Sequence, residues 1–132
     1  MKHIAFGMYD MGELLASEYG ETYFAIGTQF YNSSFTAYRS WPPDGELQNF
    51  TLRNDTSDLI NSFVEASMQT GVLLLSNQDE YERKMAAILT SPQTEHFIGL
   101  AFDVRSTYEV IPALAYDVII FIRDSTPATP AR

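Results

Sequence analysis

The chain has 132 residues, of which 45% are hydrophobic and 19% charged, a balance typical of a single globular domain rather than of a disordered chain. Eight basic and seventeen acidic residues give a formal net charge of −9. This sign argues against binding to nucleic acid or to an anionic membrane, because both need a cationic face, and it favours a neutral or cationic small molecule. The lack of cysteine excludes disulfides, thiolate nucleophiles and thiolate zinc sites.

Length and hydropathy set expectations for boundaries and location. The N-terminal apolar stretch is too short for a signal peptide, and no run of eighteen apolar residues could span a membrane. We therefore expect a cytoplasmic protein. One domain is expected over residues 1–126, followed by a flexible tail over residues 127–132.

The first predicted element is a helix that Asp10 caps and Gly20 ends, with an apolar stripe suited to covering one side of a sheet. Aromatic and β-branched residues over 22–30 predict a strand. The polar run 32–34 then predicts a turn, and alternation over 35–41 predicts a second strand.

The middle of the chain predicts a β-hairpin, a helix and a buried strand. The Pro-Pro-Asp-Gly sequence at 42–45 is a strong turn signal, after which 47–52 returns as an antiparallel strand. Thr56 or Ser57 caps a helix that ends near Gly71. The run 72–75 has no polar alternation, which is typical of a central parallel strand covered on both faces.

The last third predicts a charged helix over 78–89, a strand over 97–102 and a final apolar strand over 118–122. Pro112 interrupts residues 108–116, so we expect a loop with one helical turn there. Alternating strands and helices give the expected fold class: α/β, with a mixed, mostly parallel sheet that carries a β-hairpin insertion and is covered by helices.

The sequence contains few residues or motifs that indicate a catalytic or binding site. The sequence has no nucleophile elbow, phosphate loop, dinucleotide fingerprint or His-Glu-x-x-His motif, so no cofactor and no metal are expected. His3 is the candidate catalytic residue because imidazole exchanges protons near neutral pH; the alternative, which is the more common role for a lone histidine at a chain end, is a surface or packing residue. Tyr31, Tyr38 and Trp41 are candidate substrate-binding residues for a bulky ligand; cross-strand packing is the alternative.

Several motifs, taken in order, resemble the C-terminal part of the erythromycin esterase family. A Met-Gly helix start leads into a Tyr-x-x-Ile-Gly strand, and the two last strand motifs end in Ser-Thr-Pro-Ala. Each motif is modestly specific, but their order and spacing together cover most of the chain. The matching segments are 11–15, 18–20, 23–31, 34–37, 97–99, 116–122 and 125–128.

This resemblance implies hydrolysis of a macrolide lactone ester by an activated water. In the family a His-Asn-x-His-type motif precedes the Met-Gly helix; His3 matches its second His, whereas Met1 and Lys2 stand in place of the residues before it. The other essential residues of the family come from its earlier half. We therefore expect a truncated or stand-alone esterase-like domain with incomplete catalytic machinery, and the resistance relatives suggest a gene-cassette origin by analogy.

A second hypothesis comes from another functional class. A sheet that lacks the family's N-terminal half should expose apolar surface, which soluble proteins usually bury against a partner or a second copy. The alternative to an enzyme is thus a macrolide-like ligand-binding module or a homodimeric interaction module.

Overall fold

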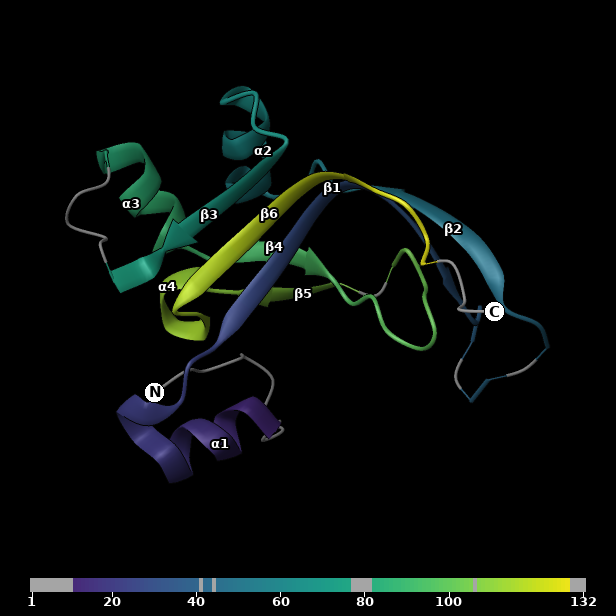
Figure 1. Ribbon diagram of the computed structural model, residues 1–132, viewed down its shortest axis with the longest axis horizontal. Coiled ribbons are helices and arrows are strands. Elements are labelled where there is room, and N and C mark those ends of the chain that lie inside the picture. The colour runs from purple at the N-terminus through teal and green to yellow at the C-terminus, as the bar shows by residue number, and fades with distance from the viewer. Residues whose placement is uncertain (1–10, 41, 44, 77–81, 106, 129–132) are drawn as a thin grey trace.

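The computed structural model describes residues 11–40, 42, 43, 45–76, 82–105 and 107–128 (Figure 1). Its main sheet has four strands in the order β2-β1-β6-β3, and a separate ribbon pairs β4 with β5. The strands are β1 (Ile26–Ala37), β2 (Gln48–Arg53), β3 (Thr70–Leu74), β4 (Gln93–His96), β5 (Thr107–Val110) and β6 (Val118–Ser125). The helices are α1 (Met11–Tyr19), η1 (Gly20–Thr22), α2 (Asp58–Glu65), α3 (Arg83–Leu89) and α4 (Pro112–Ala115).

The expected α/β class and the mixed sheet are confirmed, but the sheet is not mostly parallel. Only β1 and β6 run parallel; β1 with β2 and β3 with β6 are antiparallel. The apolar run after Gly71 suggested a central strand, yet β3 lies at the sheet edge and its burial alternates, with Val72 68% and Leu74 45% exposed. An apolar run is buried on both faces only if both faces are covered.

The predicted turn at 32–34 is wrong, because β1 continues through it as one strand of twelve residues. Asn32, Ser33 and Ser34 pair with residues of β2 on one side, and Asn32 and Ser33 also pair with β6 on the other. Ladder hydrogen bonds on both sides hold this polar segment extended in spite of its turn propensity. The predicted hairpin with the following strand is confirmed as β1 and β2.

Capping signals locate two of the helices well. Gly20 adopts φ 53° directly after α1, a left-handed conformation that glycine adopts without strain. The Ser57 side chain accepts a hydrogen bond from the Ile60 N–H and begins α2. Asp10, the predicted cap of α1, lies outside the described residues, as do 77–81 at the start of the predicted third helix. The described part of that helix is α3.

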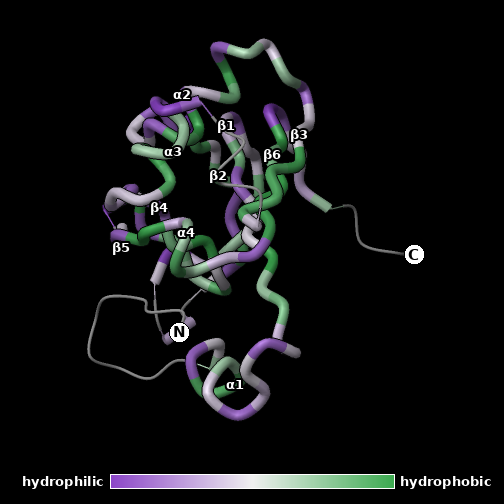
Figure 2. The backbone as a smooth tube through the Cα atoms, turned by 90° about the vertical axis from the view of Figure 1, so that its left-hand side faces the viewer, coloured by the Kyte–Doolittle hydropathy of each residue, from purple (hydrophilic) through white to green (hydrophobic). Residues whose placement is uncertain are grey.

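The main core lies on one face of the sheet, which we call the inner face. Helices α2, α3 and α4 and the β4–β5 ribbon all lie on this side of the sheet (Figure 2). Phe121 of β6 stacks on Phe63 of α2 with ring centroids 4.7 Å apart, and both are buried. The other buried members of this core are Leu59, Ile60, Leu73, Leu75, Ile88, Leu89 and Ile119.

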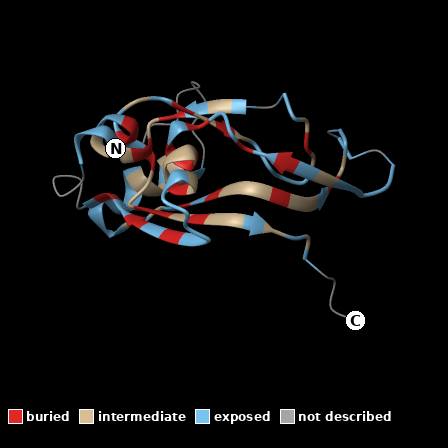
Figure 3. Ribbon diagram, turned by 90° about the horizontal axis from the view of Figure 1, so that it is seen from above, coloured by how far each residue is buried: buried red, intermediate tan, exposed pale blue. Residues whose placement is uncertain are grey.

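The opposite side of the sheet, which we call the outer face, has no described helix against it (Figure 2). Because successive side chains of a strand alternate, the paired positions of β1, β6 and β3 place a set of apolar side chains there together. Buried and exposed bands accordingly alternate along the strands (Figure 3). The apolar residues of the outer face are Ile26, Phe30, Val72, Leu74, Val118, Ile120 and Ile122, of which Val118, between Ile26 and Leu74, is only 6% exposed.

Helix α1 does not cover the sheet as its apolar stripe suggested. None of its residues is buried, and Met11 and Leu14 are 74% and 58% exposed. It lies apart from the sheet (Figure 1). Of the described helices, none has both the length and the apolarity needed to cross a membrane.

Two more expectations change in the last third of the chain. The predicted strand 97–102 is an irregular segment. Its Ala101 forms a bridge with Tyr38, the residue just after β1, and its Phe102 ring packs against Phe35 of β1 with centroids 4.8 Å apart. The strand lies instead just before it, as β4, where the polar sequence gave no apolar signal. The helical turn expected around Pro112 is confirmed as α4, but β5 before it was missed.

Candidate functional site

The inner face carries a buried carboxylate close to the middle of β1. Glu95 of β4 is 5% exposed and points toward Gln29 of β1, which is equally buried. The alternation of β4 explains the placement, because Gln93 and Glu95 are buried while their neighbours are partly exposed. Tyr108 of β5 lies opposite Glu95 in the ribbon. Tyr116, which follows α4, completes the cluster.

Three neutral groups donate hydrogen bonds to the Glu95 carboxylate. The Gln29 side-chain amide donates to Oε1, and the hydroxyls of Tyr108 and Tyr116 donate to Oε2 over 2.8 and 3.1 Å. We call these four residues the Glu95 cluster. Since a carboxylate offers about four acceptor positions, the cluster leaves one position open.

Burial controls protonation in this cluster. It raises the pKa of the Glu95 carboxyl, and the hydrogen bonds from Tyr108, Tyr116 and Gln29 offset only part of that rise. Burial, followed by the negative charge of Glu95, also raises the pKa of the Tyr116 hydroxyl, so this phenol stays neutral. Burial lowers the pKa of the neighbouring His96, which keeps its imidazole neutral near pH 7.

A polar cavity of about 220 Å³ adjoins the cluster. One wall of the cavity is β1 from Ile26 to Phe30. Among the described strands, this stretch pairs only with β6, so its other backbone edge has no neighbouring strand. The cavity is also lined by His96, whose Nδ1 is buried without a hydrogen-bond partner among the described residues. The remaining lining residues are Leu52, Asn54, Glu95, Ile98, Tyr108 and Tyr116.

A glycine in β1 sets the position of the Tyr116 ring. A Cβ atom at Gly27 would lie 3.0 Å from each of three atoms of that ring, which is tighter than nine in ten Cβ contacts in real structures. The ring therefore rests directly on the β1 backbone, and this contact holds the Tyr116 hydroxyl within reach of Glu95.

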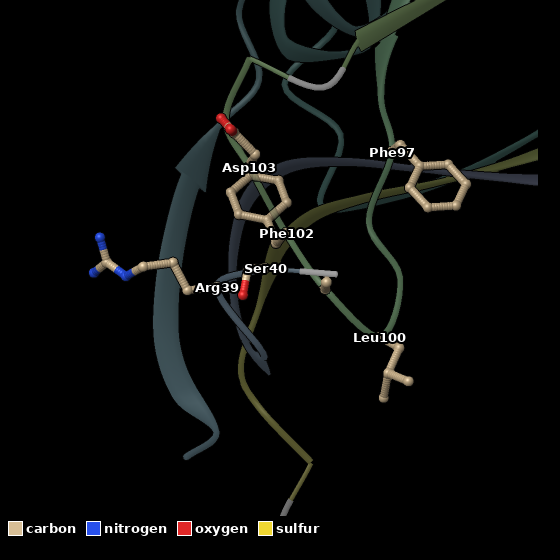
Figure 4. Close-up of a pocket in the computed structure, with 7 residues that line it drawn as sticks. Arg39, Ser40, Phe97, Leu100, Phe102 and Asp103 are labelled. Atoms are coloured by element: carbon tan, nitrogen blue, oxygen red, sulfur yellow. The ribbon is translucent and has the colours of Figure 1, made fainter. Parts of the chain in front are cut away.

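A second, larger groove lies at the far end of β1. It has a volume of about 660 Å³ and is formed between the end of β1 and the irregular segment 97–103. Phe97 and Leu100 lie on one side and the Arg39 side chain extends away on the other, with Phe102 between them (Figure 4). Its aromatic and aliphatic lining suits a bulky apolar ligand, whereas its charged groups lie at the rim.

Of the four residues predicted from sequence, the structure describes Tyr31, within β1, and Tyr38, just after it. His3 and Trp41 lie outside the described residues. Tyr31 is partly buried, packs against the main core and carries the Arg53 guanidinium 5.2 Å from its ring centroid. Tyr38 sits at the far end of β1, where its backbone bonds to Leu100 and Phe102 beside the larger groove. Whether Tyr31, Tyr38 and Trp41 bind substrate stays a prediction.

Sequence reasoning missed the Glu95 cluster altogether. Its members are spread over Gln29, Glu95, Tyr108 and Tyr116, and no local spacing joins them. The one available signal is the alternation of Gln93 and Glu95 between Pro92 and Phe97, which is the period of a strand with a polar buried side.

The chemistry open to this cluster is limited by its geometry. A buried carboxylate can hold a proton or a cation, but its hydrogen bonds go to neutral groups of the same fold and not to His96. Within the described ranges, no three His, Asp or Glu side chains gather closely enough to hold a metal ion. The Glu95 cluster is therefore better suited to binding a ligand than to supplying the base and the nucleophile of a catalytic site.

Comparison with known proteins gives one family and a recurring fold. The model of the family described as erythromycin esterase matches residues 1–125. A crystal structure of a Bacillus cereus protein superposes with a TM-score of 0.69 at 22% identity, over 92% of this chain and 29% of that one. A succinoglycan biosynthesis protein superposes with a TM-score of 0.72 at 16% identity, over 89% of this chain and 28% of that one. No curated protein matches the sequence.

These likenesses show that the fold of this chain recurs inside larger proteins. The chain spans about three tenths of the length of both solved structures. At 16% and 22% identity the structures support the fold alone, and the match to the family model rests on the sequence.

Proposed function

Because the chain belongs to the erythromycin esterase family, we propose that it is a hydrolase-type module that does not open a lactone ring by itself. The observation that carries this proposal is the Glu95 cluster. Its carboxylate is the one buried acid among the described residues, and it is engaged by three neutral donors of its own fold. Hydrolysis by activated water needs a base that reaches the water and donors that stabilise the oxyanion.

The proposal assigns the missing groups to other parts of a complete active site. His3 is the residue of this chain that we propose as one such group, because it matches the second His of the family motif. A single imidazole without its orienting partners contributes little, since groups of this kind act as a unit. The role proposed for the present module is to supply the sheet and the cavities on which such a site is built.

Incubation of the purified chain with erythromycin tests this proposal. Mass spectrometry follows the gain of one water by the macrolide, with a His3→Ala variant and a protein-free sample as controls. We expect the wild type and the variant to match the protein-free sample. Turnover by the wild type that His3→Ala abolishes would refute the proposal. Fluorescence of the single Trp41 is recorded in the same samples, and saturable quenching without product would indicate binding of the macrolide.

A second function, self-association, is supported by the outer face. Ile26, Val72 and Leu74 are 58%, 68% and 45% exposed, and their strand partners in β6 place them on the same uncovered side. Contiguous apolar surface of this kind usually marks an interface. We propose that two copies of the chain pack their outer faces together as a homodimer, which buries these side chains about a twofold axis.

Sedimentation equilibrium at high micromolar concentration tests self-association. Val72→Asp places a charge among the exposed apolar side chains of the outer face, and Thr107→Asp adds the same charge at an exposed position of β5 on the other side of the sheet. We expect a dimer for the wild type and for Thr107→Asp, and a monomer for Val72→Asp. A monomeric wild type would rule the dimer out, as would a dimer that Val72→Asp leaves intact.

A further inference from the structure

We propose that the cavity beside Glu95 binds a small protonated amine that also carries a hydroxyl group. The proposal uses the same Glu95 cluster as the proposed function but requires neither hydrolysis nor self-association, and its test measures binding rather than turnover. It names a site, a charge and a size for the ligand.

The positive charge of the proposed ligand follows from the hydrogen-bond partners of Glu95. All three of its hydrogen bonds come from an amide or a phenol, and none supplies a positive charge. The described ion pairs of basic side chains lie elsewhere, at Arg53, Lys84 and Arg105, and are exposed. A buried carboxylate without a countercharge is costly, so a cation gains much by binding beside it. The net charge of −9 attracts cations to the whole molecule.

The donor pattern follows from the acceptors that meet at the cavity. Glu95 accepts three hydrogen bonds and so retains one of its roughly four acceptor positions. An ammonium group supplies three N–H donors, which suits the carboxylate and the hydroxyl oxygens beside it. The open edge of β1 adds backbone donors and acceptors along 26–30, where a ligand hydroxyl can both give and take a hydrogen bond.

The volume limits the size of the ligand. At roughly 30 Å³ per water molecule, a cavity of about 220 Å³ holds only a handful of water-sized groups. A macrolide is far larger than this space, whereas a compact amino alcohol fits it. The Tyr108 and Tyr116 rings form part of the wall, and aromatic faces add a favourable contact to an ammonium ion.

Three probes of nearly equal size separate charge from shape: ethanolamine, which is a cation at neutral pH, ethylene glycol, which is neutral, and glycolate, which is an anion. Each is titrated at neutral pH into ¹⁵N-labelled protein while NMR follows the Gln29 side-chain amide. We expect ethanolamine to give a saturable shift in the millimolar range. Ethylene glycol should bind at least about tenfold more weakly, and glycolate should give no saturable shift.

Two variants with equal charge test the assignment to Glu95. Glu95→Gln removes the buried carboxylate, while Glu109→Gln removes an exposed one from the neighbouring strand β5. We expect the first variant to lose the ethanolamine response and the second to keep it. The proposal is overturned if ethylene glycol or glycolate binds as well as ethanolamine, or if no probe binds. It is equally overturned if Glu109→Gln and Glu95→Gln respond alike. The probe series on the wild type decides the matter even if Glu95→Gln fails to fold.

Discussion

Replacing Gly27 by alanine tests whether the Tyr116 ring rests on the β1 backbone. The added Cβ atom would lie 3.0 Å from three ring atoms of Tyr116, so the ring must move. Overpacking of this kind costs about 1–3 kcal/mol. Alanine also recovers about 0.5–1 kcal/mol, because glycine in a strand loses more conformational entropy on folding. The expected net effect is a destabilisation of up to about 2.5 kcal/mol.

A double-mutant cycle isolates the clash from the other effects. In a Tyr116→Ala background the ring is gone, so Gly27→Ala should stabilise the protein by about 0.5–1 kcal/mol. The sign of the substitution thus reverses between the two backgrounds. The coupling between the two sites should equal the clash cost of about 1–3 kcal/mol, well above the few tenths by which independent sites deviate from additivity.

Urea unfolding monitored by far-UV circular dichroism measures all four proteins of the cycle. If Tyr116→Ala alone is too unstable, the osmolyte TMAO is added at one concentration to all four, since it strengthens apolar burial. Additive free energies of unfolding within about 0.5 kcal/mol would show that the ring does not touch β1. That result would also remove the physical basis for the placement of the Tyr116 hydroxyl on Glu95.

Three further predictions concern other polar groups. Gln93→Leu removes the side-chain oxygen that accepts a hydrogen bond from the Leu59 N–H at 3.1 Å. The unpaired N–H should lower the free energy of unfolding by about 1–3 kcal/mol, as measured by urea titration. An unchanged urea midpoint would contradict this. Because the pKa of Glu95 is raised on folding, the protonated Glu95 stabilises the folded state fully at pH values below 4.5, its ordinary pKa. This stabilisation is lost as the pH rises through the pKa of Glu95 in the folded protein. Wild type should therefore lose stability relative to Glu95→Gln between acidic and neutral pH, and a constant difference would contradict the shift. Hydrogen bonds from Arg105 lower the pKa of Asp103 to about 2, and Arg105→Ala should return it toward 3.8 in an NMR titration; an unmoved pKa would reject that cause.

Local signals in the sequence were sufficient for the elements that are capped or strongly apolar. Ser57 begins α2 as predicted, and Gly20 ends α1. The apolar run after Asp117 forms β6, the strand that joins β1 to β3 at the centre of the sheet. These features depend on neighbours in sequence, so one sequence is enough to read them.

The remaining elements depend on contacts between distant segments. The polar segment at 32–34 stays extended because two other strands pair with it, and no residue within it carries that information. Strand β4 was not predicted because its buried side consists of the polar residues Gln93 and Glu95, which give no apolar alternation. A polar side chain is buried only where the fold supplies partners. The partners of Glu95 come from β1, β5 and the residue after α4, and those of Gln93 include groups of α2 and α3.

The candidate site was invisible from sequence for the same physical reason. His3 was selected because histidine is rare here and titrates near neutral pH, whereas Glu95 is one of seventeen acids. Only its burial distinguishes it from the other acids that the structure describes. The fold creates that distinction by bringing Gln29 and two phenols around a single carboxylate.

The alternation of β1 makes the two binding proposals separable. Gly27 and Gln29 face the inner side with Glu95, while Ile26 and Thr28 face the outer side with Val72. A charge introduced at Val72 therefore removes apolar outer surface and leaves the cluster on the opposite side of the sheet in place. A Val72→Asp monomer that still binds ethanolamine would show two independent surfaces on one sheet. Loss of both properties together, with the circular dichroism unchanged, would mean instead that dimer formation shapes the cavity.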